Sequence, residues 1–461
     1  MAFEKRWWPW VAIGLVLLLL ALFRDIRRVG AHHQVDLRNR VVGARLIADK
    51  RLPYFYRWKP GEPVRYYDPQ NADAADHVWD TMSTITATPL FLHLMEPLAE
   101  LQQSHIDWVW LGFEYASWAT LLVFLLLLAP TPRSKLAVTA VAIAFLFSSC
   151  WMHHIEVGQL YITIPLLAIL GYCLLRAKPT VWTGLATGLV VVVMAGIRPN
   201  VLLFFLPFLL VARRFSIPFR ISMVAAVIVV VGCMAASPFE RQLWTQYRVA
   251  VSKHIRSHLA GNPFLFSHAA RDLPVWEGVD QFHNQPPSAL STRESSNFFL
   301  VYHKLFSRFM SLGLLTFFAA ASITLLCVYF GWKNYRRRDI PMAQLALFGY
   351  CLYMITDMLS PVFRWPYYSV QWLFPVLLVL TGYPSRRRLY YALLFTGLGL
   401  LVINFGFTAY QHAAGDYLLL VTLLLLALLP GDSDMRNPLP AGVSPDQSTP
   451  RRPQPGFPKR P

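Results

Sequence analysis

The sequence predicts an all-α, polytopic membrane protein, and three observations support that prediction. Hydrophobic residues make up 55% of the 461 residues and charged residues only 15%, and the mean hydropathy is +0.41, outside the usual balance of a soluble protein. Apolar runs long enough for membrane helices recur along the chain. Short loops rich in lysine and arginine separate many of these runs, as expected where basic residues orient transmembrane helices.

Windows of about 20 residues, the length that spans a bilayer as a helix, indicate about twelve transmembrane helices. The first apolar run follows Lys5 and Arg6 as in a signal peptide, but Phe23-Arg24-Asp25 replaces a small-residue cleavage site. We therefore expect an uncleaved anchor helix. In chain order the runs lie at 7–24, 107–129, 136–152, 159–175, 181–197, 199–212, 219–237, 309–332, 341–360, 366–383, 388–405 and 415–430.

Two of the runs, 181–197 and 199–212, are individually short and meet at Arg198-Pro199-Asn200. They form either two tilted helices that meet at the outer surface or one broken helix. We favour two helices, because a single helix would carry the basic residues at 213 and 214 to the outer side.

The charge distribution predicts the orientation of the chain, whose formal net charge is +17. If the N-terminus is inside and the helices alternate, the basic clusters of the short loops all face the cytoplasm. Both termini are then cytoplasmic in a multi-pass protein of the plasma (inner) membrane, and residues 25–106 and 238–308 form two long outer loops. The clusters are Lys5/Arg6, Arg133/Lys135, Arg176/Lys178, Arg213/Arg214/Arg220, Lys333/Arg336/Arg337/Arg338 and Arg386/Arg387/Arg388.

The composition also sets the domain organisation and excludes other classes of protein. One transmembrane domain is expected over 1–430, followed at 431–461 by a disordered cytoplasmic tail rich in proline, serine and arginine. Because the basic residues are explained by topology, nucleic acid is not an expected partner. The five cysteines lie in or at the ends of apolar runs without a C-x-x-C pair, which gives no support to disulfides or zinc sites.

Asp36 stands just outside the first apolar run, ahead of a short amphipathic segment. Over 36–51 the apolar residues Leu37, Val41, Ala44 and Ala48 recur at helical spacing, which predicts a helix lying in the membrane interface. Asp36 is then either the N-cap of this helix or the carboxylate of an active site at the membrane edge. The two roles are compatible.

A second polar cluster, His153, His154 and Glu156, lies at the next predicted outer turn. H-H-x-E is not a recognised metal-ligand spacing, and a helix points consecutive histidines about 100° apart. Hydrogen bonding to a phosphate or a sugar is therefore favoured over metal binding.

Arg198 and Arg364 each lie at the outer end of an apolar run. Snorkelling to the interface is the ordinary explanation for such arginines. A guanidinium group also binds phosphate in a bidentate manner, so both arginines are candidates for a lipid-phosphate site.

The order of short motifs along the chain resembles glycosyltransferase family 87, over roughly residues 7–405. It departs from the family where Thr86-Ala87-Thr88-Pro89 replaces a Tyr-x-Pro-Pro-like signature and where arginine stands at 198 in place of the common lysine. The matching features are Asp36 after the first helix, Thr88-Pro89 entering an early apolar segment, Gly158-Gln159 opening a helix, a glycine-rich helix (Gly184, Gly188, Gly196) ending in Arg198-Pro199, and Ser360-Pro361-Val362-Phe363-Arg364-Trp365-Pro366-Tyr367-Tyr368 before a helix.

The resemblance implies a GT-C-type fold that transfers a hexose, most often mannose, from a polyprenyl phosphate to a lipid or glycan acceptor at the outer face, with inversion. Such an enzyme serves glycolipid or cell-envelope biosynthesis and contacts membrane lipids. Asp36 would be the general base on the acceptor hydroxyl, and no metal or other cofactor is expected. The substrate-binding candidates are His154, Arg198 and Arg364 for the phosphate, Gln159 for sugar hydroxyls, and Trp365 and Tyr368 from the last motif.

A transporter or flippase of lipid-linked sugars is the alternative function. Transporters place charges in the middle of helices within inverted repeats, whereas the charges here lie mainly at predicted helix ends, with Asp357 the main exception. A membrane scaffold would explain the composition but not the gathering of acidic, histidine and arginine side chains on the outer side. We therefore favour the enzyme.

Overall fold

The computed structural model describes residues 8–32, 34–68, 83, 85–259, 295–306, 310–335, 340–362, 364–381, 388–403 and 410–429. Within these ranges every regular element is an α-helix or a 3₁₀-helix, so the expected all-helical class is confirmed. The expected tail at 431–461, much of the second long loop and the basic residues at 336–338 and 386–387 lie outside the described residues.

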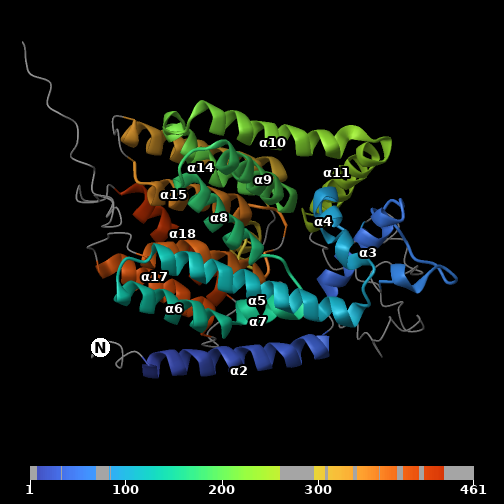
Figure 1. Ribbon diagram of the computed structural model, residues 1–461, viewed down its shortest axis with the longest axis horizontal. Helices are drawn as coiled ribbons and strands as arrows, with labels where there is room; N and C mark the ends of the chain where they lie inside the picture. Colours follow the sequence, from blue (N-terminus) through green and yellow to red (C-terminus); the bar gives the residue numbers. More distant parts are fainter. Residues whose placement is uncertain are drawn as a thin grey trace, which may run out of the picture.

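The elements follow one another as a long series of helices, most of which run side by side in one bundle (Figure 1). In chain order they are α2 (Trp8–His32), α3 (Val35–Ala48), η1 (Val64–Tyr66), α4 (Pro89–Ala99), α5 (Gln103–Leu128), α6 (Pro132–Leu146), α7 (Ser149–Val157), α8 (Thr163–Arg176), α9 (Val181–Ile197), η3 (Pro199–Phe204), η4 (Leu206–Arg214), α10 (Ile217–Ala236), α11 (Pro238–Leu259), α13 (Phe298–Phe306), α14 (Leu312–Asn334), α15 (Met342–Met358), η6 (Pro366–Trp372), α16 (Leu373–Leu380), α17 (Arg388–Val402) and α18 (Gln411–Leu428).

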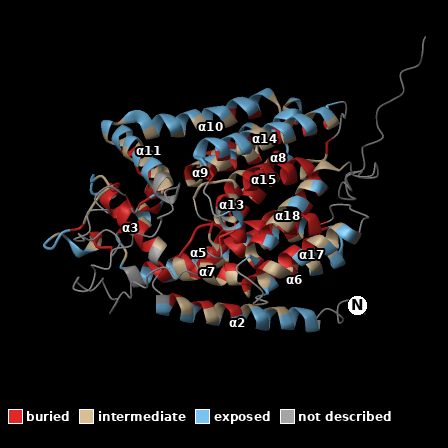
Figure 2. Ribbon diagram, turned by 180° about the vertical axis from the view of Figure 1, so that it is seen from behind, coloured by how far each residue is buried: buried red, intermediate tan, exposed pale blue. Residues whose placement is uncertain are grey.

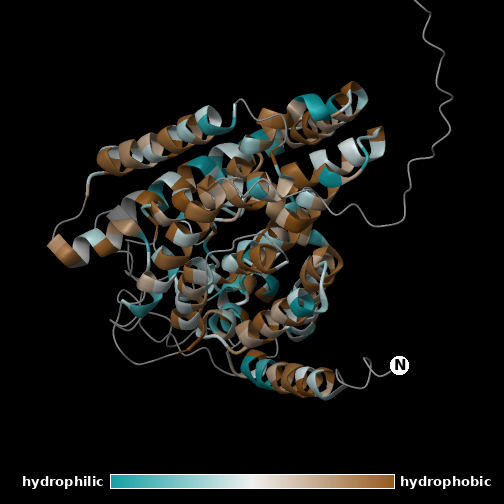
Figure 3. Ribbon diagram, turned by 90° about the vertical axis from the view of Figure 1, so that its left-hand side faces the viewer, coloured by the Kyte–Doolittle hydropathy of each residue, from teal (hydrophilic) through white to brown (hydrophobic). Residues whose placement is uncertain are grey.

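Five helices in the described part are long and apolar enough to cross a membrane: α2, α5, α10, α14 and α18. A sixth span results if α6 and α7, bent by 55° at a short break, form one crossing. Four shorter apolar segments add to these, namely α8, α9, α17 and η6 with α16. The bundle is hydrophobic along most of its helices (Figure 3). The protein is therefore embedded in a membrane, and the count of about twelve spans stays a prediction.

Burial separates an inner layer of helices from an outer layer (Figure 2). Almost every residue of α15 and all of α16 are buried, whereas α10 and α14 carry many exposed apolar side chains such as Ile228, Val229 and Phe317. Apolar side chains on an outer surface suit contact with lipid chains. The inner helices form the protein core, and the outer ones face the bilayer.

The helix that begins near Asp36 is buried on both sides. Leu37 and Val41 pack in one hydrophobic cluster, but Arg38 and Arg45 are also buried, so α3 does not present the polar face expected of an interfacial helix. Arg45 donates from three nitrogens to the carbonyls of Ala99, Arg65 and Leu101 at 2.7 to 2.8 Å. A cation at the end of α4 satisfies orphan carbonyls and complements the helix dipole, which fixes α3 against α4 beyond the end of the bundle (Figure 1).

Residues 199–214 form two consecutive 3₁₀-helices, η3 and η4, in place of the second α-helix that the apolar run predicts. The segment packs tightly on α15, because a Cβ on Gly349 would lie 2.1 Å from the carbonyl oxygen of Phe204. Only glycine permits that approach. The break after α9 therefore places Arg198 next to the carboxyl end of α15.

Candidate active site

Asp36 lies in the first turn of α3, and Gln34, in a left-handed conformation, is the N-cap residue. No side-chain hydrogen bond caps this helix, so Asp36 does not have the N-cap role. Its carboxylate instead accepts a hydrogen bond from the Gln159 amide. Burial raises the pKa of this half-buried carboxyl group above its ordinary value, while Arg40, His153 and the Gln159 hydrogen bond oppose the shift.

The turn that carries Gln159 follows the C-terminus of α7. Gly158 caps that helix with φ of 68°, a conformation that favours glycine. A Cβ on Gly158 would lie 2.7 Å from the Cβ of Leu37, so α3 approaches this turn closely. Arg40 donates to the Gly158 carbonyl at 2.9 Å and joins the turn to the helix that bears Asp36.

A stack of aromatic rings extends from the Asp36 region toward Arg198. The His153 ring stacks on Tyr367 with centroids 5.3 Å apart, and Tyr367 stacks in turn on Tyr161 at 5.6 Å and Tyr368 at 5.1 Å. Tyr161 and Tyr368 lie 4.3 Å apart. The three tyrosines are buried, whereas His153 is 36% exposed at its side chain. The stacked rings form an aromatic wall, with His153 at one end and Arg198 at the other.

Arg198 lies at the other end of this wall. Its guanidinium carbon lies 4.8 Å from the Tyr161 ring centroid and 4.6 Å from that of Tyr368, two cation–π contacts. It donates to the Tyr161 hydroxyl at 2.9 Å and forms an ion pair with Asp357. The Arg198 side chain is 22% exposed, more than that of Arg364 at 1%.

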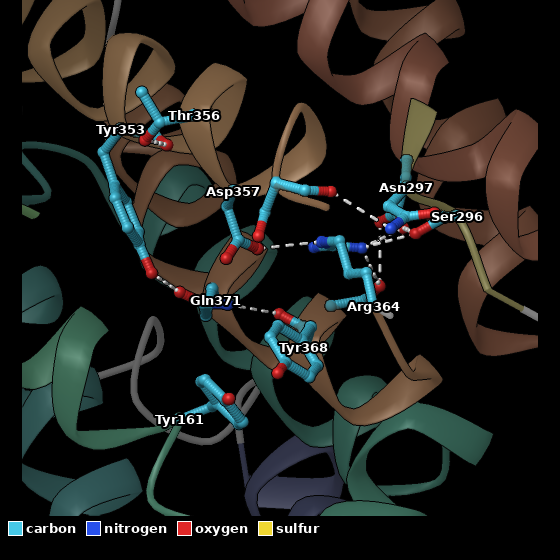
Figure 4. Close-up of polar contacts among 12 residues, drawn as sticks. Tyr161, Ser296, Asn297, Tyr353, Thr356, Asp357, Arg364, Tyr368 and Gln371 are labelled. Atoms are coloured by element: carbon cyan, nitrogen blue, oxygen red, sulfur yellow. Dashed lines mark hydrogen bonds and ion pairs between the residues drawn. The ribbon is translucent and has the colours of Figure 1, made fainter. Parts of the chain in front are cut away.

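A second arginine lies behind Arg198 in a buried ladder of alternating charges. Arg364 donates to Asp357 at 2.9 Å and forms an ion pair with Asp416 on α18. It also donates to Ser296 at 2.7 Å (Figure 4). The side chains of Arg364, Asp357 and Asp416 are each at most 2% exposed. Two arginines and two carboxylates thus balance their charges and hold α15, α18 and the loop before η6 together.

Some of the residues singled out in the sequence contact one another in the structure, and others are buried and paired elsewhere. Asp36 and Gln159 are in direct contact, and Arg198 and Tyr368 form a second contact; Trp365, half-buried, stacks on Tyr367. His154 and Arg364 are fully buried and paired with Glu114 and with two aspartates. The sequence did not single out Arg40 and Asp416, or Tyr161 and Tyr367 as members of a stack.

The His153, His154 and Glu156 side chains serve different partners. His154 hydrogen-bonds Glu114 at 2.7 Å, and Glu156 accepts from Arg28 at 3.1 Å. The described residues hold no group of three metal-ligating side chains. Because arginines supply the positive charge near Asp36 and Asp357, we expect EDTA to leave the activity of the protein unchanged. Activity assays with and without EDTA check this, and loss of turnover that added metal restores would contradict it.

The apolar helices define an integral membrane protein, and its polar cluster is a candidate substrate site. A family model described as glycosyltransferase family 87 matches residues 86–361, well over half of the chain. The chain therefore belongs to glycosyltransferase family 87 and is a membrane glycosyltransferase that uses a sugar donor and an acceptor. No curated protein and no solved structure matches it.

Proposed function

We propose that the protein transfers a hexose, mannose in the first instance, from a polyprenyl phosphate to a hydroxyl of a lipid or glycan acceptor at the outer face of the plasma membrane. Asp36 is the general base. The acceptor oxygen attacks C1 of the sugar, its proton passes to Asp36, and the C1–O bond to the phosphate breaks. The polyprenyl phosphate leaves with the bonding electron pair, and the anomeric configuration inverts.

The surroundings of Asp36 support its role as the base. Its carboxylate is half-buried, and its pKa is raised by desolvation, which makes it a better proton acceptor once ionised. Arg40 and His153 act in the opposite direction and favour the ionised form. A carboxylate with a raised pKa is, in its ionised form, a stronger base toward the hydroxyl proton.

Arg198 is assigned to the phosphate of the donor. A phosphate leaving group needs cationic stabilisation more than a general acid, and Arg198 is cationic, partly exposed and held by two tyrosine rings. The buried arginine, Arg364, acts through Asp357, which it shares with Arg198. His154, paired with Glu114, supports the turn that carries Gln159.

One observation carries the proposal: a single aromatic wall holds a carboxylate at one end and a partly exposed arginine at the other. The purified protein should therefore transfer labelled hexose from polyprenyl phosphates to lipid acceptors and not from nucleotide diphosphate sugars. Transfer from nucleotide sugars alone would contradict the donor class. Donor movement across vesicles without transfer would support a flippase instead.

The proposed orientation places the site outside the cell. We expect a cysteine at Lys59, an exposed residue after α3, to react with an impermeant thiol reagent in intact cells. A cysteine at Tyr335, 76% exposed at the end of α14, should react only after permeabilisation. Both variants carry Cys233→Ser, because Cys233 is an exposed native thiol. Labelling at 335 from outside would place the opposite face of the protein outward.

A further inference from the structure

The Gln159 amide is held at both of its ends, between the proposed base and a cation. Its Nε2 donates to Oδ2 of Asp36, and its Oε1 accepts from Arg40 at 2.6 Å. The Gln159 side chain belongs to a residue that is only 2% exposed. These contacts occupy the amide with protein groups, so a contact with sugar hydroxyls is not its main role.

We propose that Gln159, fixed by Arg40, is a positioning residue that orients the Asp36 carboxylate toward the acceptor hydroxyl. This inference rests on the proposed function, in which Asp36 is the base. Arg40 completes the device and adds a positive charge beside the carboxylate.

The direction of the Gln159 amide follows from the chemistry of its neighbours. A glutamine amide has a donor end and an acceptor end that can exchange places by rotation. Arg40 can only donate hydrogen bonds, so it selects the carbonyl oxygen and turns the NH₂ group toward Asp36. Without Arg40, the carbonyl could rotate toward the carboxylate and repel it.

Helix geometry places the two charged groups for this bridge. Asp36 and Arg40 are four residues apart on α3, which brings them to the same face of the helix. The Gly158 turn lies against that face, and Arg40 also donates to the Gly158 carbonyl. The amide therefore spans both side chains from a fixed backbone position.

The bridge leaves one carboxylate oxygen for the substrate. Oδ2 of Asp36 accepts from Gln159, while its Oδ1 takes no side-chain hydrogen bond from the residues that the structure describes. A base held through one oxygen presents the other in a defined direction. Gln159 thus acts on the reaction through Asp36.

The charged neighbours of Asp36 are few, which makes its titration a useful measure. Arg40 on α3, His153 on α7 and Tyr367 on η6 face it. The ionisable groups of the other adjoining helices pair elsewhere: His93 of α4 contacts Glu96 and Glu240, and Arg28 of α2 contacts Glu156. Glu114 of α5 pairs with His154 and interacts electrostatically with Arg40. A change at Gln159 therefore reports directly on the carboxylate.

The test is Gln159→Leu, assayed over pH for hexose transfer from a polyprenyl phosphate hexose. We expect kcat to fall about 10- to 100-fold, the cost of misplacing a catalytic group by about 1 Å, with the donor KM unchanged. Loss of a hydrogen bond to the charged carboxylate raises its pKa, so the acidic limb of kcat/KM moves to higher pH. Gln102→Leu, at an exposed glutamine before α5, is the matched control and should behave like the unaltered protein.

A double variant separates positioning from sugar binding. In an Asp36→Asn background, Gln159→Leu should cause no further loss, because a residue that acts through Asp36 has nothing left to orient. A raised donor KM with an unmoved acidic limb, or an additive loss in the double variant, would overturn the inference and indicate a sugar contact.

Gln159→Glu covers the case in which Gln159→Leu does not fold. It preserves the size of the side chain and puts a second carboxylate beside Asp36, so the acidic limb should rise by about one pH unit or more. An unmoved limb overturns the inference.

Normal transfer by Asp36→Asn would contradict the proposed function as well. An inactive Asp36→Asn protein with a fully normal Gln159→Leu protein would defeat only the role of Gln159.

Discussion

Asp36→Asn is expected to lower turnover by about two to four orders of magnitude, the usual range for loss of general-base assistance. Asparagine preserves the size of the side chain but cannot accept the hydroxyl proton. Donor binding should change little, because the phosphate contact is assigned to Arg198 at the other end of the aromatic wall. Single-turnover transfer and donor affinity, measured on one preparation, check the prediction.

The matched control for this variant is Asp49→Asn, at the opposite end of α3. Asp49 is the C-cap residue and contacts Tyr66 and Arg65, away from the Gln159 turn. It should retain normal transfer. If a stable, donor-binding Asp36→Asn protein transfers sugar at a near-normal rate, Asp36 has no part in the chemistry.

Asp416→Asn is expected to lower the free energy of unfolding by about 3–5 kcal/mol, the cost of leaving a buried charge without its partner. Asp416 is fully buried and forms an ion pair with Arg364. It also accepts hydrogen bonds from Trp372 at 2.6 Å and Ser369 at 2.8 Å. Asparagine retains some of these bonds but leaves Arg364 with only Asp357. Denaturant titration in mixed micelles measures the loss.

Glu100→Gln is the control for this experiment, since it breaks an ion pair on the surface. Glu100 accepts from Arg65 at 3.0 Å, but its side chain is 73% exposed. Exposed pairs contribute about 0–1 kcal/mol. Equal losses in the two variants would show that the buried ladder does not hold the helices together.

The hydropathy of the chain predicts the outer helices well. The runs at 219–237 and 309–332 match α10 and α14 closely, because a lipid-facing helix is apolar over most of its length. The run at 7–24 also predicts α2, but this helix continues through charged residues to His32. The run at 199–212 does not match, since close packing of the Phe204 backbone on Gly349 favours 3₁₀ geometry. That packing depends on a residue far away in the sequence, which a local pattern does not record.

The sequence singles out several polar residues of the candidate site but not the residues that they contact. Asp36, Gln159 and Arg198 follow helix breaks or apolar runs, and such positions mark them in the sequence. The spacing of four residues between Asp36 and Arg40 places both on one face of a helix, which could have indicated a contact. The N-cap explanation of Asp36 does not draw on that spacing. No local pattern pairs Arg364 with Asp416, 52 residues further along the chain.

The burial of α3 shows why composition alone misassigns a helix. Its arginines gave the segment the appearance of an interfacial helix with one polar face. The Arg45 guanidinium instead donates hydrogen bonds to backbone carbonyls at the end of α4. These bonds allow a charged side chain to lie inside the protein. The sequence around Arg45 does not show that backbone carbonyls at the end of α4 lie within reach of this arginine.

The anomeric configuration of the product tests the central claim most directly. A base on the acceptor hydroxyl and a departing phosphate together describe a single displacement at C1. With a polyprenyl phosphate hexose of known configuration as donor, NMR of the isolated product should show the opposite anomer. Retention of the donor's configuration would require two displacements and a nucleophile on the enzyme, and would contradict the role of Asp36 as a general base.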